Sequence, residues 1–247
     1  MDRMIYTAAS GAARVLEQQA VISNNLANIG TTGFREQMSI YRSVPLLSEA
    51  GMPTRVSTVA STPGSDMGQG VMVETGKALD AAISGQGWFS VWTPQGEAYT
   101  RAGDFGVNEQ GQLVTRQGLP VLSEDGVPME IPERGAVTFS GDGRVTVLGA
   151  GDRPNDLQVI GRLKLVNPTE DELVRGDDGL FRMRTPQPVQ ADPQVRIIPG
   201  FIEKSNVNAA EAMVGMIANA RKFEMQMKVI QDAGTNAERA NSILSAG

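Results

Sequence analysis

Three acidic residues between positions 172 and 178 are the side chains in this sequence best suited to acid–base chemistry. Asp177 is the central one, with Glu172 or Asp178 as a second carboxylate. A pair of carboxyl groups, one protonated and one ionised, is the arrangement that hydrolyses glycosidic bonds. Nothing in the pattern singles out the second carboxylate, so a hydrolase of polysaccharides stays an alternative and is not the main hypothesis.

Two short motifs resemble binding sites only in part. The sequence RGDDG at residues 175–179 contains an adhesion tripeptide, but its aspartates and glycines are typical of a turn. The same aspartates lack the further oxygen ligands of a calcium loop. The sequence GQG at residues 85–87 lacks the third glycine and the lysine of phosphate-binding loops, and we interpret it as a tight turn.

The composition removes most metal and nucleophile chemistry. The 247 residues include no cysteine and no histidine, which excludes disulfides, thiolate or imidazole metal sites and histidine-activated nucleophiles. Adaptable packing against several neighbours is a better interpretation than a soft-metal site for Met213, Met216, Met225 and Met227. The sequence therefore predicts no catalytic residue, no metal site and no cofactor.

The net charge favours protein partners. A formal charge of −6, with no cluster of Lys and Arg, argues against a nucleic-acid surface. A hydrophobic content of 40% is enough for a folded core. Residues 1–11 lack the pattern of a secretory signal, and the chain has no long apolar run. We expect neither a cleaved signal peptide nor insertion into a membrane.

Residues 1–34 are predicted to form a first amphipathic helix. Mainly apolar residues recur at spacings of three and four, which places them on one face of the helix. Gly30 is the expected left-handed residue that ends the helix, before a loop. The predicted face consists of Ile5, Ala8, Ala12, Val15, Gln19, Ile22 and Leu26.

Residues 203–247 are predicted to form a second, longer helix. Asn208 has the side chain of an N-cap, and Glu211 can reach back to it in a variant of the capping box. The spacing of three and four recurs along this segment, and only a glycine and an asparagine interrupt its apolar character. The predicted face consists of Met213, Met216, Ala220, Phe223, Met227, Ile230, Gly234, Ala237, Asn241 and Leu244.

Strand patterns lie between the two helices. Short β-prone runs separated by turn residues occupy residues 87–92, 99–101, 105–107, 113–115, 137–139, 145–147 and 163–166. Residues 42–70 lack periodicity and are expected to be ordered only against another surface. The predicted fold class is α+β: terminal helices that form a discontinuous coiled-coil domain, an extended connector at residues 35–74, and an inserted antiparallel all-β domain at residues 75–202.

Asn24, Asn25 and Asn28 stand in the first helix although asparagine is a poor helix former. Their amides must find partners outside that helix. Amides at helix contacts can bond across chains and fix the register of packing. We therefore expect these residues to lie in a wall of several helices; a hairpin within one chain is the alternative.

A set of short motifs runs in order along nearly the whole chain. These motifs are SNNLAN at residues 23–28, TGF at 32–34, LDAAISGQGWF at 79–89, YTRAGDF at 99–105, GQLVT at 111–115, IEKSNVN at 202–208, EAM at 211–213 and RKFE at 221–224. Together they resemble the rod and hook proteins of the bacterial flagellum. The opening MDRMIYTA, DGLFR at 178–182 and EMQMKVI at 224–230 are most similar to the proximal-rod members. Distal-rod members typically have a longer connector.

The resemblance implies a structural subunit and not an enzyme. Such subunits are exported unfolded by the flagellar type III apparatus without a cleaved signal. They assemble helically with copies of themselves and with neighbouring rod proteins around the export channel of the basal body. The rod crosses the periplasm and transmits motor torque to the hook. The alternatives are a distal-rod or hook-family paralogue, a secreted adhesin and a cell-wall hydrolase.

The residues expected to make assembly contacts lie in the helices and beside them. In this family the terminal helices form the inner tube of the rod, where neighbouring helices pack and the channel lining stays wet. The predicted contacts are Asn24, Asn25, Leu26, Asn28, Phe34, Ser205, Asn206, Val207, Met213, Ile217, Phe223 and Met227.

Overall fold

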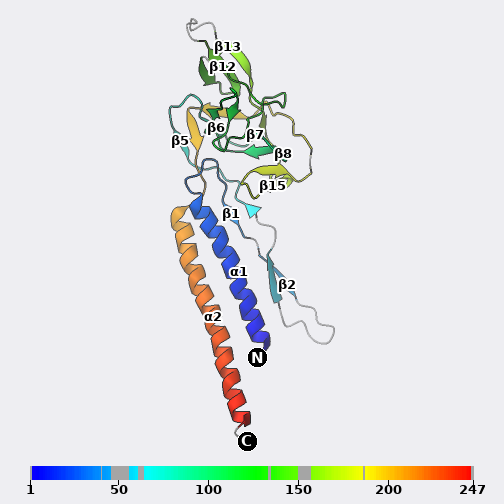
Figure 1. Cartoon of the computed structure of the whole chain (residues 1–247), viewed down its shortest axis with the longest axis vertical. Helices are drawn as coiled ribbons and strands as arrows, with labels where there is room; N and C mark the ends of the chain where they lie inside the picture. Colours follow the sequence, from blue (N-terminus) through cyan, green and yellow to red (C-terminus); the bar gives the residue numbers. More distant parts are fainter. Residues whose placement is uncertain are drawn as a thin grey trace. The chain divides into compact units, whose positions relative to one another are not determined.

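The computed structural model of the protein divides into two compact units, which we describe separately. The helical unit comprises residues 1–29, 36–66 and 207–247, and the β unit comprises residues 30–35 and 67–206. The structure describes residues 2–39, 41–45, 56–60, 64–132, 135–149, 157–185 and 187–245. An N-terminal helix, a C-terminal helix and antiparallel strands between them confirm the predicted α+β class (Figure 1).

Two long helices dominate the helical unit. α1 (Asp2–Ala27) and α2 (Ala209–Ser245) lie side by side and antiparallel (Figure 1). A Cβ atom on Gly11 would lie 3.1 Å from the side chain of Gln226, and one on Gly215 would lie 3.2 Å from Ile22. Small residues therefore let the two backbones approach at these points. No helix in the described part of the chain has an apolar stretch long enough to cross a membrane.

The predicted contact face of α1 is confirmed by the burial of its side chains. The two alanines at its centre, Ala8 and Ala12, are 4% and 7% exposed. The remaining members are partly buried: Ile5, Val15, Gln19, Ile22 and Leu26. Every residue selected by the spacing of three and four is thus withdrawn from solvent to some degree, as expected for a helix with one packed face.

The predicted contact face of α2 is wrong at several positions. Met213, Ala220 and Met227 are exposed, and so is Asn241 further along the helix; the side chain of Leu244 lies outside the described part. The face that is buried or partly buried at the same spacing consists of Ala212, Met216, Asn219, Phe223, Gln226, Ile230, Ala233 and Ala237. Two polar residues, Asn219 and Gln226, belong to this face. The prediction selected the apolar residues that follow them, Ala220 and Met227, instead.

α1 ends without a left-handed glycine at the predicted position. The amide of Asn28 donates to the carbonyls of both Asn24 and Asn25, at 3.1 Å each. These bonds satisfy carbonyls of the last turn, which otherwise have no partner within the helix. The prediction for Gly30 is wrong, because the left-handed glycine that follows α1 is Gly33, with φ +68°.

α2 begins with the predicted N-cap. The side-chain oxygen of Asn208 accepts hydrogen bonds from the amides of Ala210 at 3.0 Å and Glu211 at 3.4 Å. Its backbone carbonyl accepts the amide of Ala212 at 2.9 Å. Two of the amides that lack a partner at a helix start are therefore bonded by one side chain.

Paired strands replace part of the predicted connector. β1 (Gln37–Met38) pairs with β4 (Gly64–Ser65), and β2 (Tyr41–Pro45) pairs with β3 (Val56–Ala60), both antiparallel. These strands bond each other's backbone groups, which the sequence did not predict because they lack apolar periodicity. The expectation that the segment is ordered only against another surface stays a prediction. Residues 40, 46–55 and 61–63 of the predicted connector lie outside the described part of the chain.

Every strand pair of the β unit is antiparallel, as predicted. A five-stranded sheet has the order β14-β7-β8-β16-β15, with β7 (Trp88–Thr93), β8 (Gly96–Thr100), β14 (Leu165–Val166), β15 (Leu173–Arg175) and β16 (Phe181–Met183). A three-stranded sheet joins β11 (Ala136–Phe139), β12 (Arg144–Leu148) and β13 (Gln158–Arg162). Two-stranded pairs join β5 (Met72–Glu74) to β18 (Phe201–Glu203), β6 (Ala81–Ser84) to β17 (Arg196–Pro199), and β9 (Gly106–Val107) to β10 (Leu113–Val114).

The strand β7 carries side chains into two apolar clusters. Alternate residues of a strand point to opposite faces of a sheet. Phe89 and Val91 belong to the larger cluster, where the rings of Phe89 and Phe105 meet edge-on with their centres 5.0 Å apart. Trp88 belongs to the smaller cluster and packs on Phe181, with the two ring centres 4.7 Å apart. β7 is thus covered on both faces except at Trp92, which is 50% exposed.

Replacing Gly33 by alanine should destabilise the protein more than the same change at Gly76. Both glycines are left-handed, with φ +68° and +67°, but only at Gly33 would a Cβ meet backbone, 2.3 Å from the nitrogen of Ala102. We expect a loss of about 1–2 kcal/mol for Gly76→Ala from the backbone conformation. Gly33→Ala should lose roughly 2 kcal/mol more through overpacking. Urea unfolding measures both variants, and equal losses would contradict the close approach.

Candidate assembly surface

Two of the acidic residues that could form a catalytic pair are bonded in ways that keep them ionised. The carboxylate of Glu172, in the short 3₁₀ helix Glu170–Glu172, accepts the hydroxyl of Thr169 at 2.8 Å and its amide at 3.0 Å, and these bonds lower the pKa of Glu172. Hydrogen bonds from Arg182 at 3.0 and 2.5 Å lower the pKa of Asp178. A general acid needs a raised pKa, so neither is suited to be the protonated partner of Asp177.

The motifs interpreted as turns are turns. RGDDG lies between β15 and β16, where the amide of Gly176 donates to the carbonyl of Leu180 at 2.8 Å and Gly179 has φ +80°. GQG connects β6 to β7, with φ +81° at Gly85 and +130° at Gly87. These positive φ values require glycine, so the backbone conformation accounts for both motifs.

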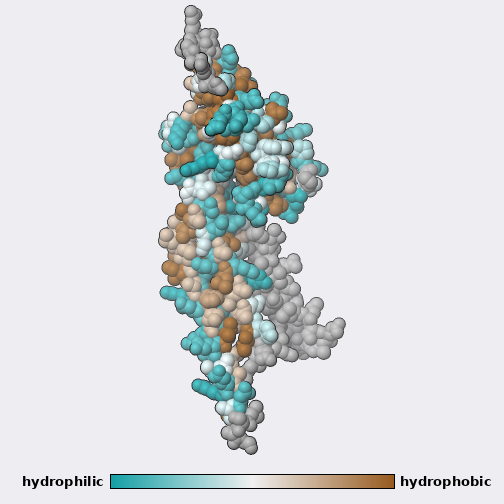
Figure 2. All heavy atoms as spheres, in the orientation of Figure 1, coloured by the Kyte–Doolittle hydropathy of each residue, from teal (hydrophilic) through white to brown (hydrophobic). Residues whose placement is uncertain are grey.

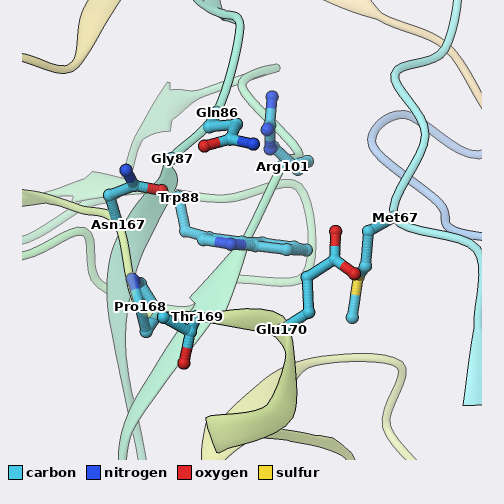
Figure 3. Close-up of a pocket in the computed structure, with 9 residues that line it drawn as sticks. All are labelled: Met67, Gln86, Gly87, Trp88, Arg101, Asn167, Pro168, Thr169 and Glu170. Atoms are coloured by element: carbon cyan, nitrogen blue, oxygen red, sulfur yellow. The ribbon is translucent and has the colours of Figure 1, made fainter.

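A pocket of about 280 Å³ opens beside Trp88 in the β unit. In Figure 3, Arg101 and Gln86 lie above the indole of Trp88, Thr169 lies below it, and Glu170 stands beside its right-hand end. The tryptophan is only 5% exposed. A sugar ring would need an open aromatic face for stacking, and ligand pockets are usually larger than about 300 Å³. The pocket therefore gives no support to a polysaccharide substrate.

Exposed apolar side chains form a stripe along α2. Met213, Ile217 and Met227 are 51%, 57% and 46% exposed, and the exposed Ala220 lies between them on the same face. We call these four residues the outer stripe. At about 100° per residue, the outer stripe lies roughly a quarter turn around α2 from the face that packs on α1. Apolar side chains are also visible on the helices in Figure 2. Exposed apolar surface of this kind marks contacts between proteins.

The residues predicted to make assembly contacts differ in their burial. The exposed ones are Asn24, Met213, Ile217 and Met227, and the partly buried ones are Leu26, Asn28, Phe34, Asn206 and Phe223. Asn25, Ser205 and Val207 are buried within this chain. Their role in assembly stays a prediction, and another chain could reach the exposed group directly.

Asn25 acts as a substitute for a strand partner. Its side-chain nitrogen donates to the carbonyl of Gln37 at 2.8 Å, and its side-chain oxygen accepts the amide of Gln37 at 2.9 Å. Paired antiparallel strands exchange the same two bonds. Asn28 instead donates to the carbonyl of Asn24 at 2.9 Å, within its own helix end. The prediction of a partner outside the helix is thus confirmed for Asn25, but that partner belongs to the same chain.

Buried polar atoms without a partner lie on the packed faces of α1 and α2. The side-chain oxygen of Gln19 and the side-chain nitrogen of Asn219 make no hydrogen bond within the described residues. A buried polar atom left unpaired costs about 1–3 kcal/mol. The antiparallel register, with Gly11 beside Gln226, brings the two residues to the same level of the pair. The groups left over are an acceptor on Gln19 and a donor on Asn219.

A buried cluster of charges in the β unit was not predicted. Glu203 is fully buried and forms ion pairs with Arg35 at 2.6 Å and Arg101 at 3.0 Å. Both guanidinium groups lie over the ring of Trp88, at 5.9 and 5.3 Å from its centre. Burial lowers the pKa of Arg101 to about 10, although attraction to Glu203 acts in the opposite direction. No sequence signal pointed to this cluster, because spacing cannot pair charged residues in segments so far apart.

Family models match three parts of this chain. The model described as "Flagella basal body rod protein" matches residues 5–35, and "Flagellar hook protein FlgE/F/G D1 domain" matches residues 82–147. The model "Flagellar basal body rod FlgEFG protein C-terminal" matches residues 198–243. All three describe one class of proteins, the rod and hook proteins of the flagellum.

Full-length relatives narrow this class. The chain is 49% identical to the flagellar basal-body rod protein FlgF of Escherichia coli and 46% identical to that of Salmonella typhimurium; each alignment covers 99% of both chains. It is 29% identical to the flagellar basal-body rod protein FlgG of Bacillus subtilis, over 93% of this chain and 94% of that one. The chain therefore belongs to the family of the flagellar basal-body rod protein FlgF.

Replacing Asn25 by alanine should destabilise the helical unit, because the backbone groups of Gln37 would lose both partners. We expect a loss of about 1–3 kcal/mol in the free energy of unfolding. Asn24→Ala is the matched control: Asn24 is exposed, and alanine favours helix by roughly 0.5 kcal/mol. Urea unfolding followed by circular dichroism compares the two variants. A loss as large in Asn24→Ala as in Asn25→Ala would exclude the proposed role of the buried amide.

Proposed function

We propose that this chain is a structural subunit of the flagellar basal-body rod, in its proximal part, and has no enzymatic activity. Copies of the chain assemble helically with each other and with neighbouring rod proteins around the export channel, and the rod transmits motor torque to the hook. Membership of the FlgF family supports the place in the rod. The outer stripe is the observation that supports assembly through the helices.

The packing of the helical unit leaves the outer stripe free for a second chain. α1 covers a different face of α2, so contact through Met213, Ile217 and Met227 does not require the two helices to separate. Methionine side chains are flexible and polarisable, which suits a surface that must pack against several different neighbours. The terminal helices would thus form a discontinuous coiled-coil domain in the assembled rod, with the β unit inserted between them.

Export and location complete this proposal. The subunit reaches the rod unfolded, through the flagellar type III export apparatus and without a cleaved signal peptide. It then resides in the part of the basal body that crosses the periplasm, without insertion into a membrane and without binding nucleic acid. Absence of cysteine means that no disulfide has to be formed or reduced along this route.

The other functions have less support. A cell-wall hydrolase would need a protonated carboxyl group beside Asp177, and both nearby candidates have lowered pKa values. A secreted adhesin would present RGD to a receptor, but here that sequence is part of a hairpin turn. A distal-rod or hook-family paralogue remains the nearest alternative, since identity to a FlgG protein is substantial but lower.

Replacing Ile217 by aspartate should abolish swimming without unfolding the protein. Ile217 is 57% exposed, so a charge there is hydrated in the free chain and would be buried only after assembly. We expect a change in unfolding free energy of at most about 1 kcal/mol. The measurements are a motility plate and thermal unfolding of the purified variant. Phe223→Asp is less informative, because Phe223 lies on the face packed against α1 and its loss would disturb the chain itself.

Ala218→Asp is the matched control for Ile217→Asp. It adds the same charge to the neighbouring exposed residue, about 100° further around α2 and away from the outer stripe. Strains with Ala218→Asp should swim. Normal swimming with Ile217→Asp, or equal loss with both variants, would rule out the outer stripe as the specific contact.

Electron microscopy of basal bodies from a strain that lacks this chain tests the function as a whole. Complexes that stop at the inner-membrane ring, with a missing or truncated rod, would support the proximal-rod proposal. A rod that is complete up to the hook junction would favour the distal paralogue. Intact, swimming flagella would reject a rod function and leave the adhesin and the hydrolase.

A further inference from the structure

Three segments of the β unit converge on Glu203. One carboxylate oxygen forms an ion pair with Arg35 at 2.6 Å and accepts the amide of Gly70 at 2.8 Å, and the other accepts a hydrogen bond from Arg101 at 3.0 Å. The backbone carbonyl of Glu203 also accepts the amide of Gly33 at 2.7 Å. Both oxygens of the carboxylate are thus in use, and the contacts come from residues 30–35, residues 67–70 and Arg101.

The two arginines have no alternative partner for their charge. The side chain of Arg35 is 0% exposed and that of Arg101 is 5% exposed. Within the described residues, Glu203 is the acidic group that forms an ion pair with either of them. The nitrogens of Arg35 make no hydrogen bond within these residues apart from that ion pair. Without the carboxylate of Glu203, two guanidinium groups would be buried without an anion, which strongly disfavours the closed arrangement.

The backbone around the cluster leaves no room for a looser docking. A Cβ atom at Gly70 would lie 1.9 Å from the carbonyl oxygen of Lys204, and one at Gly33 would lie 2.3 Å from the nitrogen of Ala102. The segment 30–35 follows α1, and residues 204–208 lead into α2. The segments that adjoin the two helices in the sequence, residues 30–35 and 204–208, are therefore held in place by contacts at Glu203 and Lys204.

We propose that Glu203 is a latch residue: docking of its carboxylate between Arg35 and Arg101 orders residues 30–35 and 67–70 against the rest of the β unit. Arg35 and Arg101 both lie far before Glu203 in the sequence, so the latch closes only when the C-terminal part is in place. The strands and apolar clusters form the body of the β unit, and the latch completes it. The inference deepens the proposed rod function and rests on it only in its link to assembly, because the latched segments adjoin the helices proposed to assemble.

Glu203→Gln tests the latch by removing the charge while keeping the shape and one acceptor oxygen. Amide hydrogen exchange of the purified full-length chain, followed by nuclear magnetic resonance, reports each backbone contact separately. We expect exchange at Gly33 and Gly70 to become at least tenfold faster. The amides of Ser90 and Trp92 in β7, which bond Lys164 and Pro120, should keep their protection.

Glu97→Gln is the matched control for that variant. Glu97 pairs with Lys164 at 2.8 Å in the same unit, and both side chains are largely buried. Its loss should leave exchange at Gly33 and Gly70 unchanged. The latch proposal is wrong if the amides of Gly33 and Gly70 stay protected in Glu203→Gln, or if amide exchange increases equally throughout β7 and β8.

Arg35→Gln provides a second test that does not require Glu203→Gln to fold. It removes one cation and leaves the pair of Arg101 with Glu203 intact. Exchange should become faster at Gly33, whose segment carries Arg35, and stay slow at Gly70, whose amide still reaches the carboxylate. Equal opening of both segments would overturn the assignment of separate docking contacts.

Motility separates failure of the latch from failure of the rod function. Loss of swimming with Glu203→Gln but not with Glu97→Gln supports the link to assembly. Normal swimming with an open latch removes that link and leaves the rod function standing. The exchange measurement uses the isolated chain, so it judges the latch even if the basal bodies of the deletion strain prove normal.

Discussion

The burial of Glu203 between two guanidinium groups constrains the β unit more narrowly than its apolar clusters do. Apolar contacts are non-directional and tolerate small shifts. A buried carboxylate tolerates few shifts, because each of its oxygens needs a protein hydrogen-bond donor or cation to replace the water molecules that it loses on burial. Here these donors come from residues 30–35, residues 67–70 and Arg101. A buried ion pair is weak grounds for stability, but this cluster admits few arrangements of the segments that meet on it.

The two units use apolar side chains in opposite ways. In the β unit, β7 lies between two buried clusters, and the sheets close over them. In the helical unit, α1 covers one face of α2, and the outer stripe stays exposed. The apolar clusters of the β unit are thus buried within it, while the described part of α2 leaves the apolar outer stripe exposed.

Periodicity was sufficient to predict elements but not all of their faces. The strands of hairpins such as β7–β8 and β11–β12, and both helices, follow from apolar spacing and turn residues. On α2 the apolar pattern selected Met213 and Met227, because the burial of Asn219 and Gln226 depends on where α1 lies. Gly30 matched the composition of a helix end as well as Gly33 did. The difference between them came from the backbone that approaches Gly33 from a distant segment.

The candidate site was predictable to the extent that it depends on local chemistry. The turn at RGDDG and the N-cap at Asn208 follow from residue type, because their bonds lie within a few positions. The charge cluster of Arg35, Arg101 and Glu203 does not follow from residue type, because each of these residues taken alone resembles an ordinary charged residue of the surface. Arg35 is followed by Glu36 and Glu203 by Lys204, so the local sequence resembles that of an exposed segment and gives no sign of burial.

The asparagines of the first helix show how a locally unfavourable residue becomes favourable in the fold. The helix propensity of asparagine at position 25 is lower than that of the better helix-forming residues by about a few tenths of a kcal/mol. In return it binds both backbone groups of Gln37, which otherwise would face a helix side with no backbone donor or acceptor to offer. Only a side chain that carries a donor and an acceptor at the geometry of a peptide group can do this. The strand β1 can therefore begin directly beside α1, and the chain passes from helix to strand without leaving Gln37 unpaired.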